Sequence, residues 1–423
     1  MNTSLKPYPK YKDSGVEWIS SVPSGWDIKP LKALFRPKKE LIGKDEEKYT
    51  LLRLSLNGVF PKQEGQSGKN PANYEAYQLY SPGDLVFCTF DYDVTPRTIG
   101  LVQEPGILTG AYTRLVPKPE VSSKYYYYFY LVLDTNKELL HLCTGLRHGL
   151  SKFVFWALPN PVPPLETQKS IAAFLDERTK VIDELIAKKE RLMELLREKR
   201  QSLIIRVVTK GLDPKAKMKA SGMEWVGDIP KEWKILPFRS LFREKNISNE
   251  SGSVQNVLSL SYGRIVDRDV ESNFGLLPAS FDTYQIIEAG WIVFRLTDLQ
   301  NDHKSLRTAL ATKRGIITSA YLAVEAMHQV RPAYASYLLH AYDLCKVFYS
   351  MGGGIRQSID YVDLKWMPIP LPSIEEQDAI IQHVDKEAMK IDKAATLIAS
   401  QLEQLKEYRA SLIYSSVTGK IKV

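Results

Sequence analysis

The sequence contains little cysteine. Cys88, Cys143 and Cys345 are scattered through 423 residues, and no two of them form a CxxC pair. A disulfide framework needs several closely spaced cysteines and a thiolate zinc site needs paired ones, so both are excluded. This cysteine usage is typical of the reducing cytoplasm, which is where we expect the chain to be located.

Long hydrophobic runs are also lacking. The longest apolar and aromatic run covers Tyr125–Leu133, whereas a helix needs about 20 residues to cross a bilayer. The first residues, MNTSLKPYPKYKDSG, have no apolar core of the signal-peptide type. We therefore expect a soluble protein without a membrane partner.

Motifs of catalysis are missing as well. GQSGKN at 65–70 lacks the spacing of a phosphate-binding loop, and no GxGxxG follows a strand-like run. NPVPP, which begins at Asn160, differs from the Asn-Pro-Pro-aromatic motif of amino-methyltransferases. The six histidines have no metal-ligand spacing. We predict no catalytic residue and no metal site, and the carboxylate pairs Asp91/Asp93 and Asp298/Asp302 leave a nuclease as an alternative.

Positive charge is in modest excess. The chain has 57 Lys and Arg against 49 Asp and Glu, a net charge of +8, and a pI near 9.0. This excess favours a polyanionic partner, either nucleic acid or an acidic membrane surface. The length is too great for one ordinary core and indicates two or three domains.

The dominant feature that is present is an internal repeat. SGVEWISSVPSGWDIKPLKALF, from Ser14, recurs as SGMEWVGDIPKEWKILPFRSLF, from Ser221, with ten of 22 positions identical. LPNPVPPLETQKSIAAFLDE, from Leu158, recurs as MPIPLPSIEEQDAIIQHVDK, from Met367. The lags are 207 and 209 residues, so each copy occupies about half of the chain.

The two copies are alike at their ends and differ in their middles. Residues 44–75 share little with 251–282, and residues 88–108 share little with 295–317. One explanation is neutral drift in surface loops. The other is that two equivalent modules recognise two different things, and the pattern alone does not separate these explanations.

The middle of each copy carries strand-like runs bounded by turn residues. These are GDLVFCTF, TIGLV and AYTRLV in the first copy, and NVLSLSYG, GWIVFRL and AYLAV in the second. Helices are predicted at Lys124–Leu142 and Pro332–Tyr349, with their aromatic side chains in the core rather than stacked on bases. The Trp- and Pro-rich start of each copy is expected to be packed and irregular rather than helical.

Each copy ends in a long segment without glycine or proline, from about Gln168 to Arg206 and from Glu376 to Val417. Ser373-x-x-Glu376 fits a capping box. Both segments carry an apolar heptad seam that one helix alone cannot bury, so we predict an antiparallel coiled coil of the two helices. The predicted seam consists of Leu175, Ile182, Leu185, Leu192, Leu196, Leu203, Val384, Ile391, Ile398, Leu405 and Leu412.

Duplicated variable modules followed by duplicated long helices resemble the specificity (S) subunit of Type I restriction-modification systems. The wording GVEWISSVPSGW, PGDLVF, GLRHGLSKFVFWALPNPVPPLETQKSIAAFLD and GIITSAY is similar to that of the family, and the resemblance covers essentially the whole chain. The predicted fold class is α+β, with two mixed α/β target-recognition domains related by duplication and separated by the two long helices. The predicted parts are a first recognition domain (1–157), a first spacer helix (158–212), a second recognition domain (213–366, with a linker at 213–221) and a second spacer helix (367–423).

The resemblance also implies partners and cofactors. Each recognition domain would bind one half of a bipartite, asymmetric site on double-stranded DNA, and the helices would set the gap. Two methyltransferase subunits would carry S-adenosylmethionine, and two restriction subunits that use ATP and Mg can join them in a phage-defence complex. This chain itself would bind no cofactor and would be non-catalytic.

Candidate DNA-contacting residues are donors and acceptors in the polar loops. Arg147 and Arg356 recur in both copies, which favours a shared role, either backbone positioning or structural anchoring, over half-site discrimination. The run 295–307 (RLTDLQNDHKSLR) is polar, basic and bounded by strand-like segments. The candidates are Arg53, Asn57, Asp91, Tyr92, Arg97 and Arg147 in the first copy, and Tyr262, Arg264, Arg295, Asp298, Gln300, Asn301, Lys304, Arg307, Arg356 and Gln357 in the second.

Two further functions remain open at this point, in addition to the nuclease. The same subunit architecture would serve a Type IIB-like nuclease-methyltransferase. A scaffold is the rival from a different class, with a coiled coil that joins proteins and modules that bind protein or sugar.

Overall fold

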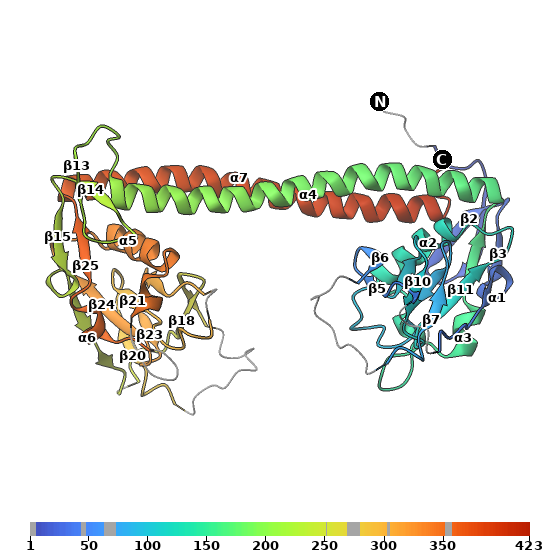
Figure 1. Ribbon diagram of the computed structural model, residues 1–423, viewed down its shortest axis with the longest axis horizontal. Coiled ribbons are helices and arrows are strands. Elements are labelled where there is room, and N and C mark those ends of the chain that lie inside the picture. Colours follow the sequence, from blue (N-terminus) through green and yellow to red (C-terminus); the bar gives the residue numbers. More distant parts are fainter. Residues whose placement is uncertain are drawn as a thin grey trace. The chain divides into compact units, whose positions relative to one another are not determined.

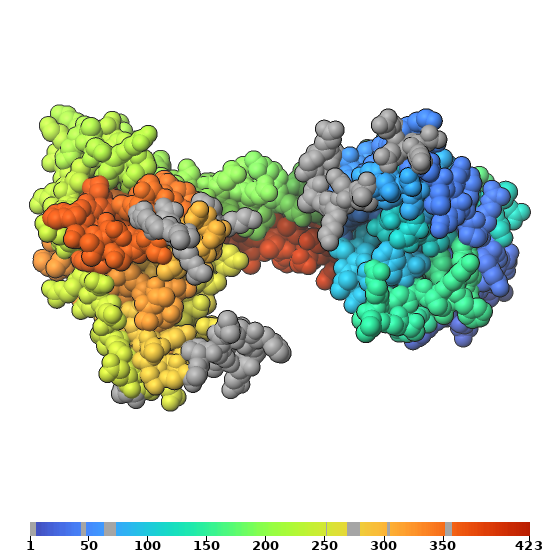
Figure 2. Space-filling view, turned by 60° about the horizontal axis from the view of Figure 1, so that its bottom comes forward, coloured from blue at the N-terminus to red at the C-terminus, as the bar shows by residue number. Residues whose placement is uncertain are grey.

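The computed structural model describes residues 6–43, 48–62, 73–250, 252–268, 280–302, 305–351 and 358–423. The chain forms two compact units, which we call unit 1 (1–189 with 400–423) and unit 2 (190–399). In each unit, the globular part outside the two long helices is one continuous stretch of sequence. It is coloured blue to green in unit 1 and yellow-green to orange in unit 2 (Figure 2). The predicted boundaries treat the helices as separate parts, whereas each compact unit includes the adjoining ends of both helices.

Each globular part begins with an antiparallel hairpin followed by a buried tryptophan. Trp26 and Trp233 are 2% and 1% exposed. The predicted absence of a helix here is confirmed, but the expected irregular packing is wrong because the prolines lie at strand ends, where a missing N–H is tolerated. The hairpins are β1 (Tyr11–Val16) with β2 (Ile19–Pro23), and β13 (Met218–Ala220) with β14 (Asp228–Pro230).

The core of each unit is a four-stranded antiparallel sheet, ordered β4-β11-β8-β9 in unit 1 and β16-β24-β21-β22 in unit 2. Most of the predicted strand-like runs contain one of these strands, which confirms them. The unit 1 strands are β4 (Phe35–Pro37), β8 (Leu85–Phe87), β9 (Ile99–Leu101) and β11 (Thr113–Pro117). The unit 2 strands are β16 (Phe242–Lys245), β21 (Ile292–Phe294), β22 (Thr308–Leu310) and β24 (Leu322–Ala326).

Smaller elements surround these sheets (Figure 1). Paired strands in unit 1 are β3 (Asp27–Pro30) with β12 (Pro159–Val162), β5 (Leu52–Ser55) with β6 (Gly58–Pro61), and β7 (Gln78–Tyr80) with β10 (Gly106–Leu108). In unit 2 they are β15 (Lys234–Pro237) with β25 (Pro368–Leu371), β18 (Leu258–Ser261) with β19 (Arg264–Asp267), and β17 (Ile247–Ser248) with β20 (Gln285–Ile287) and β23 (Gly315–Ile317). The short helices are α1 (Leu31–Leu34), α3 (Lys152–Ala157) and α6 (Tyr361–Leu364), with 3-10 turns at Leu140–Leu142, Phe238–Ser240 and Val347–Ser350.

One aromatic-rich helix packs against each sheet, namely α2 (Ser123–Thr135) in unit 1 and α5 (Pro332–Leu344) in unit 2. Most of the aromatic rings of both helices are buried, which confirms their core role. Both helices end earlier than predicted. Lys137 and Lys346 have φ values of 54° and 59°, and this left-handed conformation ends a helix, so only a 3-10 turn follows.

The two long helices are α4 (Leu165–Lys210) and α7 (Ile374–Val417). They pair antiparallel in each unit, as predicted (Figure 1). In unit 1, Lys189 Nζ donates to Gln401 Oε1 at 2.6 Å and Arg409 Nε donates to Asp183 at 2.7 Å. In unit 2, Arg200 lies 3.5 Å from Asp392.

The seam of the coiled coil corrects part of the prediction. The predicted positions spaced by seven from Leu175 and from Val384 are buried or partly buried, as expected. Leu185 and Leu192, by contrast, are 41% and 44% exposed, so their predicted place in the seam is wrong. The second row of the α4 seam lies one residue further along, at Thr179, Ile186, Met193 and Arg200.

The ends of the long helices dock on the leading hairpins. Tyr125 Oη donates to the carbonyl of Val417 at 2.7 Å, and Lys420 Nζ donates to the carbonyl of Ser21 at 3.0 Å. In unit 2, Lys210 Nζ donates to the carbonyl of Val226 at 2.9 Å. Gly419 has a φ of 71°, and a Cβ there would lie 2.9 Å from Trp26, so the dock requires glycine.

Candidate nucleic-acid interface

A two-stranded hairpin projects from each sheet and carries candidate residues on its surface. Arg53 lies exposed on β5 and Asn57 lies exposed in the β5–β6 turn. In unit 2, Tyr262 has a φ of 46° in the β18–β19 turn and is 81% exposed, and Arg264 starts β19. Leu56, which the sequence argument missed, is 61% exposed at the place equivalent to Tyr262. Each hairpin tip thus presents one large side chain to solvent beside polar ones.

The loop after β8 in unit 1 and the loop after β21 in unit 2 each contain an aspartate with a positive φ. Asp91 has a φ of 49° and Asp298 a φ of 58°, and they lie 207 residues apart, the lag of the leading repeat. Because a left-handed non-glycine residue is strained, its recurrence at one place indicates a shared local function.

Asp91 holds an exposed guanidinium group. Arg147 Nε donates to Asp91 Oδ1 at 2.9 Å, a second bond joins Nη2 to Oδ2, and the guanidinium lies 4.7 Å from the centre of the Phe90 ring. The bond to Arg147 lowers the pKa of Asp91. Arg147 is therefore fixed in direction while its side chain is 67% exposed, which is the arrangement of a preorganised donor.

The second copy shares part of this arrangement. Asp298 Oδ1 accepts from Asn301 Nδ2 at 2.7 Å. Gln300 and Asn301 are exposed, whereas Arg295 is half-buried. The remaining candidates of this copy, Lys304, Arg356 and Gln357, lie outside the described residues.

Two predicted DNA contacts are wrong because their side chains are buried. Tyr92 and Arg307 are both 0% exposed. Arg307 donates from Nη1 to the carbonyl of Thr297 at 3.1 Å and from Nε to the hydroxyl of Tyr349 at 3.2 Å. These bonds satisfy the charge inside unit 2, so Arg307 is a structural residue.

Arg97 is likewise held by contacts inside its own unit. Arg97 Nη1 lies 3.0 Å from Asp134 Oδ2, and the Thr98 hydroxyl donates to Asp134 Oδ1 at 2.7 Å. The amide of Thr98 also donates to Asp134 Oδ2 at 3.1 Å, and at the equivalent place in unit 2 the amide of Arg307 donates to Asp343. Burial raises the pKa of Asp343 to about 6. Asp134 and Asp343 lie 209 residues apart, the lag of the closing repeat, so the repeat alignment could have shown this recurring aspartate.

The carboxylate pairs do not form a metal centre within the described residues. Asp91 is engaged by Arg147, and Asp93 accepts from His148 Nδ1 at 2.7 Å. The described part of the chain contains no cluster of three or more His, Cys, Asp or Glu side chains that could hold a metal ion. Among the same residues, no helix is long and apolar enough to cross a membrane.

Two units, each with a four-stranded antiparallel sheet and the adjoining ends of two antiparallel long helices, define a known class of fold. A solved structure on complex assembly and conformational transition of the type I R-M system contains a chain with TM-score 0.68 and 14% identity, covering 95% of this chain and 99% of that one. The HsdS subunit from Thermoanaerobacter tengcongensis has TM-score 0.50 and 14% identity, covering 95% and 98%. The fold is therefore that of the HsdS class.

Sequence comparison leads to particular relatives. The putative type I restriction enzyme MjaX specificity subunit of Methanocaldococcus jannaschii is 22% identical over 428 residues, which cover 96% of each chain. The MjaVIII specificity subunit of the same organism is 23% identical over 337 residues, or 75% of each chain. No family model matches the chain. The resemblance to type I specificity subunits is confirmed in sequence and in fold.

Proposed function

We propose that this chain is the DNA sequence-specificity subunit of a Type I restriction-modification complex. The observation that carries the proposal is one scaffold built twice with unlike exposed loops. Both units share the sheet order, the aromatic helix and the left-handed aspartate, whereas the exposed residues of the projecting hairpins differ. Two equivalent scaffolds with different surfaces fit two unlike half-sites, each read by one unit.

The proposed division of labour places exposed polar groups at the DNA. Arg147, oriented by Asp91, would form bidentate bonds with a base edge or a phosphate, and Arg53, Asn57 and Arg264 would contact DNA from the hairpins. Phosphate contacts supply much of such affinity and make it salt-sensitive, which suits a chain with a net charge of +8.

Partner subunits would dock on the long helices. Outside the seam, α4 exposes Val181, Leu185, Leu192 and Leu195, which helix geometry places within an arc of about 80°. An apolar stripe of this kind supports packing of further helices. We assign it to methyltransferase subunits, which would bring S-adenosylmethionine, while restriction subunits would bring ATP and Mg. This chain would bind no cofactor and catalyse no step.

The test is co-expression with the methyltransferase subunits, followed by mapping of methylated bases along a genome. We expect one bipartite motif. Replacement of residues 222–357 by the corresponding region of another specificity subunit should change only one half of that motif. A change in both halves would contradict the two-module reading.

A separate measurement addresses the scaffold alternative. Duplex DNA binding by the complex should weaken steeply between low and moderate salt, because phosphate contacts displace counterions. A scaffold for protein or sugar would show no such dependence. Cleavage of plasmid by the chain alone with Mg²⁺, lost on Asp91→Ala and Asp93→Ala, would instead support the nuclease alternative.

A further inference from the structure

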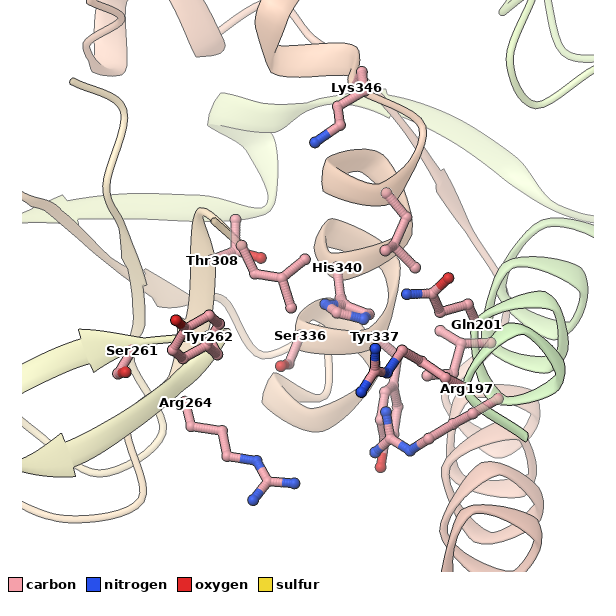
Figure 3. Close-up of a pocket in the computed structure, with 15 residues that line it drawn as sticks. Arg197, Gln201, Ser261, Tyr262, Arg264, Thr308, Ser336, Tyr337, His340 and Lys346 are labelled. Atoms are coloured by element: carbon pink, nitrogen blue, oxygen red, sulfur yellow. The ribbon is translucent and has the colours of Figure 1, made fainter. Parts of the chain in front are cut away.

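A large open cavity lies in unit 2 between the long helix and the recognition domain. Its volume is about 960 Å³, and three elements surround it: α4, the β18–β19 turn and α5 (Figure 3). Residues from α4 and from the recognition domain thus face one common space. The polar lining residues that matter for its chemistry are Arg197, Arg200, Tyr262, Arg264, His340 and Lys346.

The charge of this cavity has one sign. Arg197, Arg200, Arg264 and Lys346 line it, and no aspartate or glutamate is among the lining residues. Arg200 is paired with Asp392 at 3.5 Å. Within the described ranges, the side chains of Arg197 and Arg264 form no hydrogen bond or ion pair with the chain, and both residues are exposed. Two guanidinium groups on opposite sides of the space therefore have their donors available.

His340 adds no charge at neutral pH. Burial, and secondarily the nearby Arg200, lower its pKa to about 4. The imidazole is therefore neutral at pH 7 and can donate one hydrogen bond into the cavity without repelling the cations around it.

The equivalent place in unit 1 provides an internal comparison. A cavity of about 590 Å³ lies between α2 and the end of α7, where Lys406 and Arg409 occupy the positions equivalent to Arg197 and Arg200, 209 residues earlier. There, however, Glu138 lines the space, and Arg97 and Arg409 are paired with Asp134 and Asp183. The duplicated scaffold thus carries unpaired guanidinium groups in unit 2, whereas those of unit 1 are neutralised.

The chemistry of this cavity suits phosphate groups. A guanidinium group presents a planar fork of donors that matches phosphate oxygens bidentately. Tyr262 extends from the turn beside Arg264 and is 81% exposed, so it would supply an apolar surface next to the charges. An open site of about 960 Å³ with cations on two sides fits successive phosphates of a strand better than one small anion.

We propose that this cavity holds the phosphodiester backbone of DNA beside the half-site that unit 2 reads. The α4 helix, through Arg197, would then be a DNA-contacting element in addition to a spacer, and Arg264 would be its partner from the recognition domain. This inference rests on the proposed function.

The test uses the complex with methyltransferase subunits and the double variant Arg197→Gln with Arg264→Gln. Affinity for duplex DNA should fall, and the slope of log K against log salt should become less steep by about 2, at roughly 0.9 for each lost phosphate contact. The methylated motif should stay the same because phosphates carry no sequence information. The matched control is Lys406→Gln, at the equivalent place in unit 1, which should leave the slope unchanged.

Three results would overturn the proposal. The first is an unchanged salt slope in a double variant whose thermal unfolding matches that of the parent. The second is an altered motif, which would make these arginines base readers. The third is pyrophosphate that binds the parent calorimetrically and is lost in the double variant while the DNA slope stays unchanged, since the cavity would then take free anions. Failure of the parent complex itself to bind its motif would instead contradict the proposed function.

Discussion

At the scale of single residues, burial decides what an arginine does. Arg97 and Arg147 each bond to an aspartate in the same unit. The Arg97 side chain is 15% exposed and Asp134 is 1% exposed, so that pair holds α2 against the loop before β9. The Arg147 side chain is 67% exposed, so its aspartate orients it toward solvent. The same chemistry thus gives a buried pair in one place and an exposed, oriented donor in the other.

The buried pair gives a stability prediction. Asp134→Ala should lower the free energy of unfolding by about 3–5 kcal/mol, because it leaves Arg97 as an uncompensated buried charge. The matched control, Asp91→Ala, should leave stability nearly unchanged and weaken DNA binding through loss of the Arg147 orientation. Chemical denaturation and DNA titration measure the two effects. Equal destabilisation by both variants would contradict this distinction.

His340 makes stability sensitive to acid. Its folded pKa of about 4 lies below the ordinary value of 6.5, so the unfolded chain takes up a proton first as the pH falls. The contribution of the neutral imidazole to the free energy of unfolding is therefore complete above pH 6.5, and it is lost as the pH falls toward 4. Between pH 7 and pH 5 this costs about 2 kcal/mol.

Denaturation of His340→Gln at both pH values isolates this effect. The variant should lose about 2 kcal/mol less than the parent over the interval. The raised pKa of Asp343 acts in the opposite direction, since a raised carboxyl pKa favours the folded state as the pH falls, and it is common to both proteins. An identical pH dependence would show that His340 does not titrate as stated.

At the scale of elements, the long helices show how far a sequence pattern reaches. The heptad series that starts at Leu175 was predictable because it is apolar at almost every step. The second row of the seam could not be predicted in the same way. Its actual positions include the polar residues Thr179 and Arg200, whereas the positions predicted in error, Leu185 and Leu192, are leucines. Hydrophobicity cannot distinguish a seam leucine from one on an outer face meant for a partner. The strands and aromatic helices could be predicted because their sequence patterns are local. The burial of Tyr92 and Arg307, by contrast, depends on packing against residues far away in the sequence.

The corrected seam can be tested with a matched pair. Ile182→Ala should destabilise the protein by about 2–4 kcal/mol, because Ile182 is 7% exposed and its removal leaves a cavity between the helices. Leu185→Ala, at 41% exposure, should cost less than about 1 kcal/mol. Thermal unfolding separates these outcomes, and the reverse order would restore the original heptad assignment.

A spacer made of two paired helices must be lengthened in both. One heptad inserted near Leu195 and another near Thr396, its approximate antiparallel counterpart, would preserve the seam and add about 10.5 Å. At roughly 3.4 Å for each base pair, the gap in the methylated motif should grow by about three bases while both half-sites keep their letters. Methylation sequencing provides the measurement. A stable insertion protein with an unchanged gap would remove the spacer role from these helices.

At the scale of the whole molecule, the duplication extends to the way the chain closes on itself. The segment after α7 docks on the first leading hairpin as the last residue of α4 docks on the second. The amide of Lys422 donates to the carbonyl of Lys6 at 2.8 Å, so the two ends of the described chain are adjacent within unit 1. The junction at the ends and the junction after α4 are therefore structurally alike.

This likeness predicts tolerance of a circular permutation. A short linker that joins the segments at Lys6 and Lys422, with new ends opened in the loop between Gly211 and Met218, should give a folded subunit that directs methylation of the same motif. The matched control opens the chain at Leu196 inside α4 and should fail to fold, because it breaks a paired helix. Circular dichroism and motif mapping report both results, and a misfolded loop permutant would contradict the equivalence of the junctions.

The composition of unit 1 also bears on the order of events during synthesis. Its core includes Leu412, Ile413 and Val417 from the last part of α7, packed with residues of the first recognition domain. Unit 2 is continuous from residue 190 to residue 399, so all of it has been synthesised before the last part of unit 1 exists. The domain made first therefore stays incompletely packed until the end of α7 has been synthesised. A nascent chain released early would retain the second reader and lack a finished first one, so premature termination would damage recognition at the opposite end of the sequence.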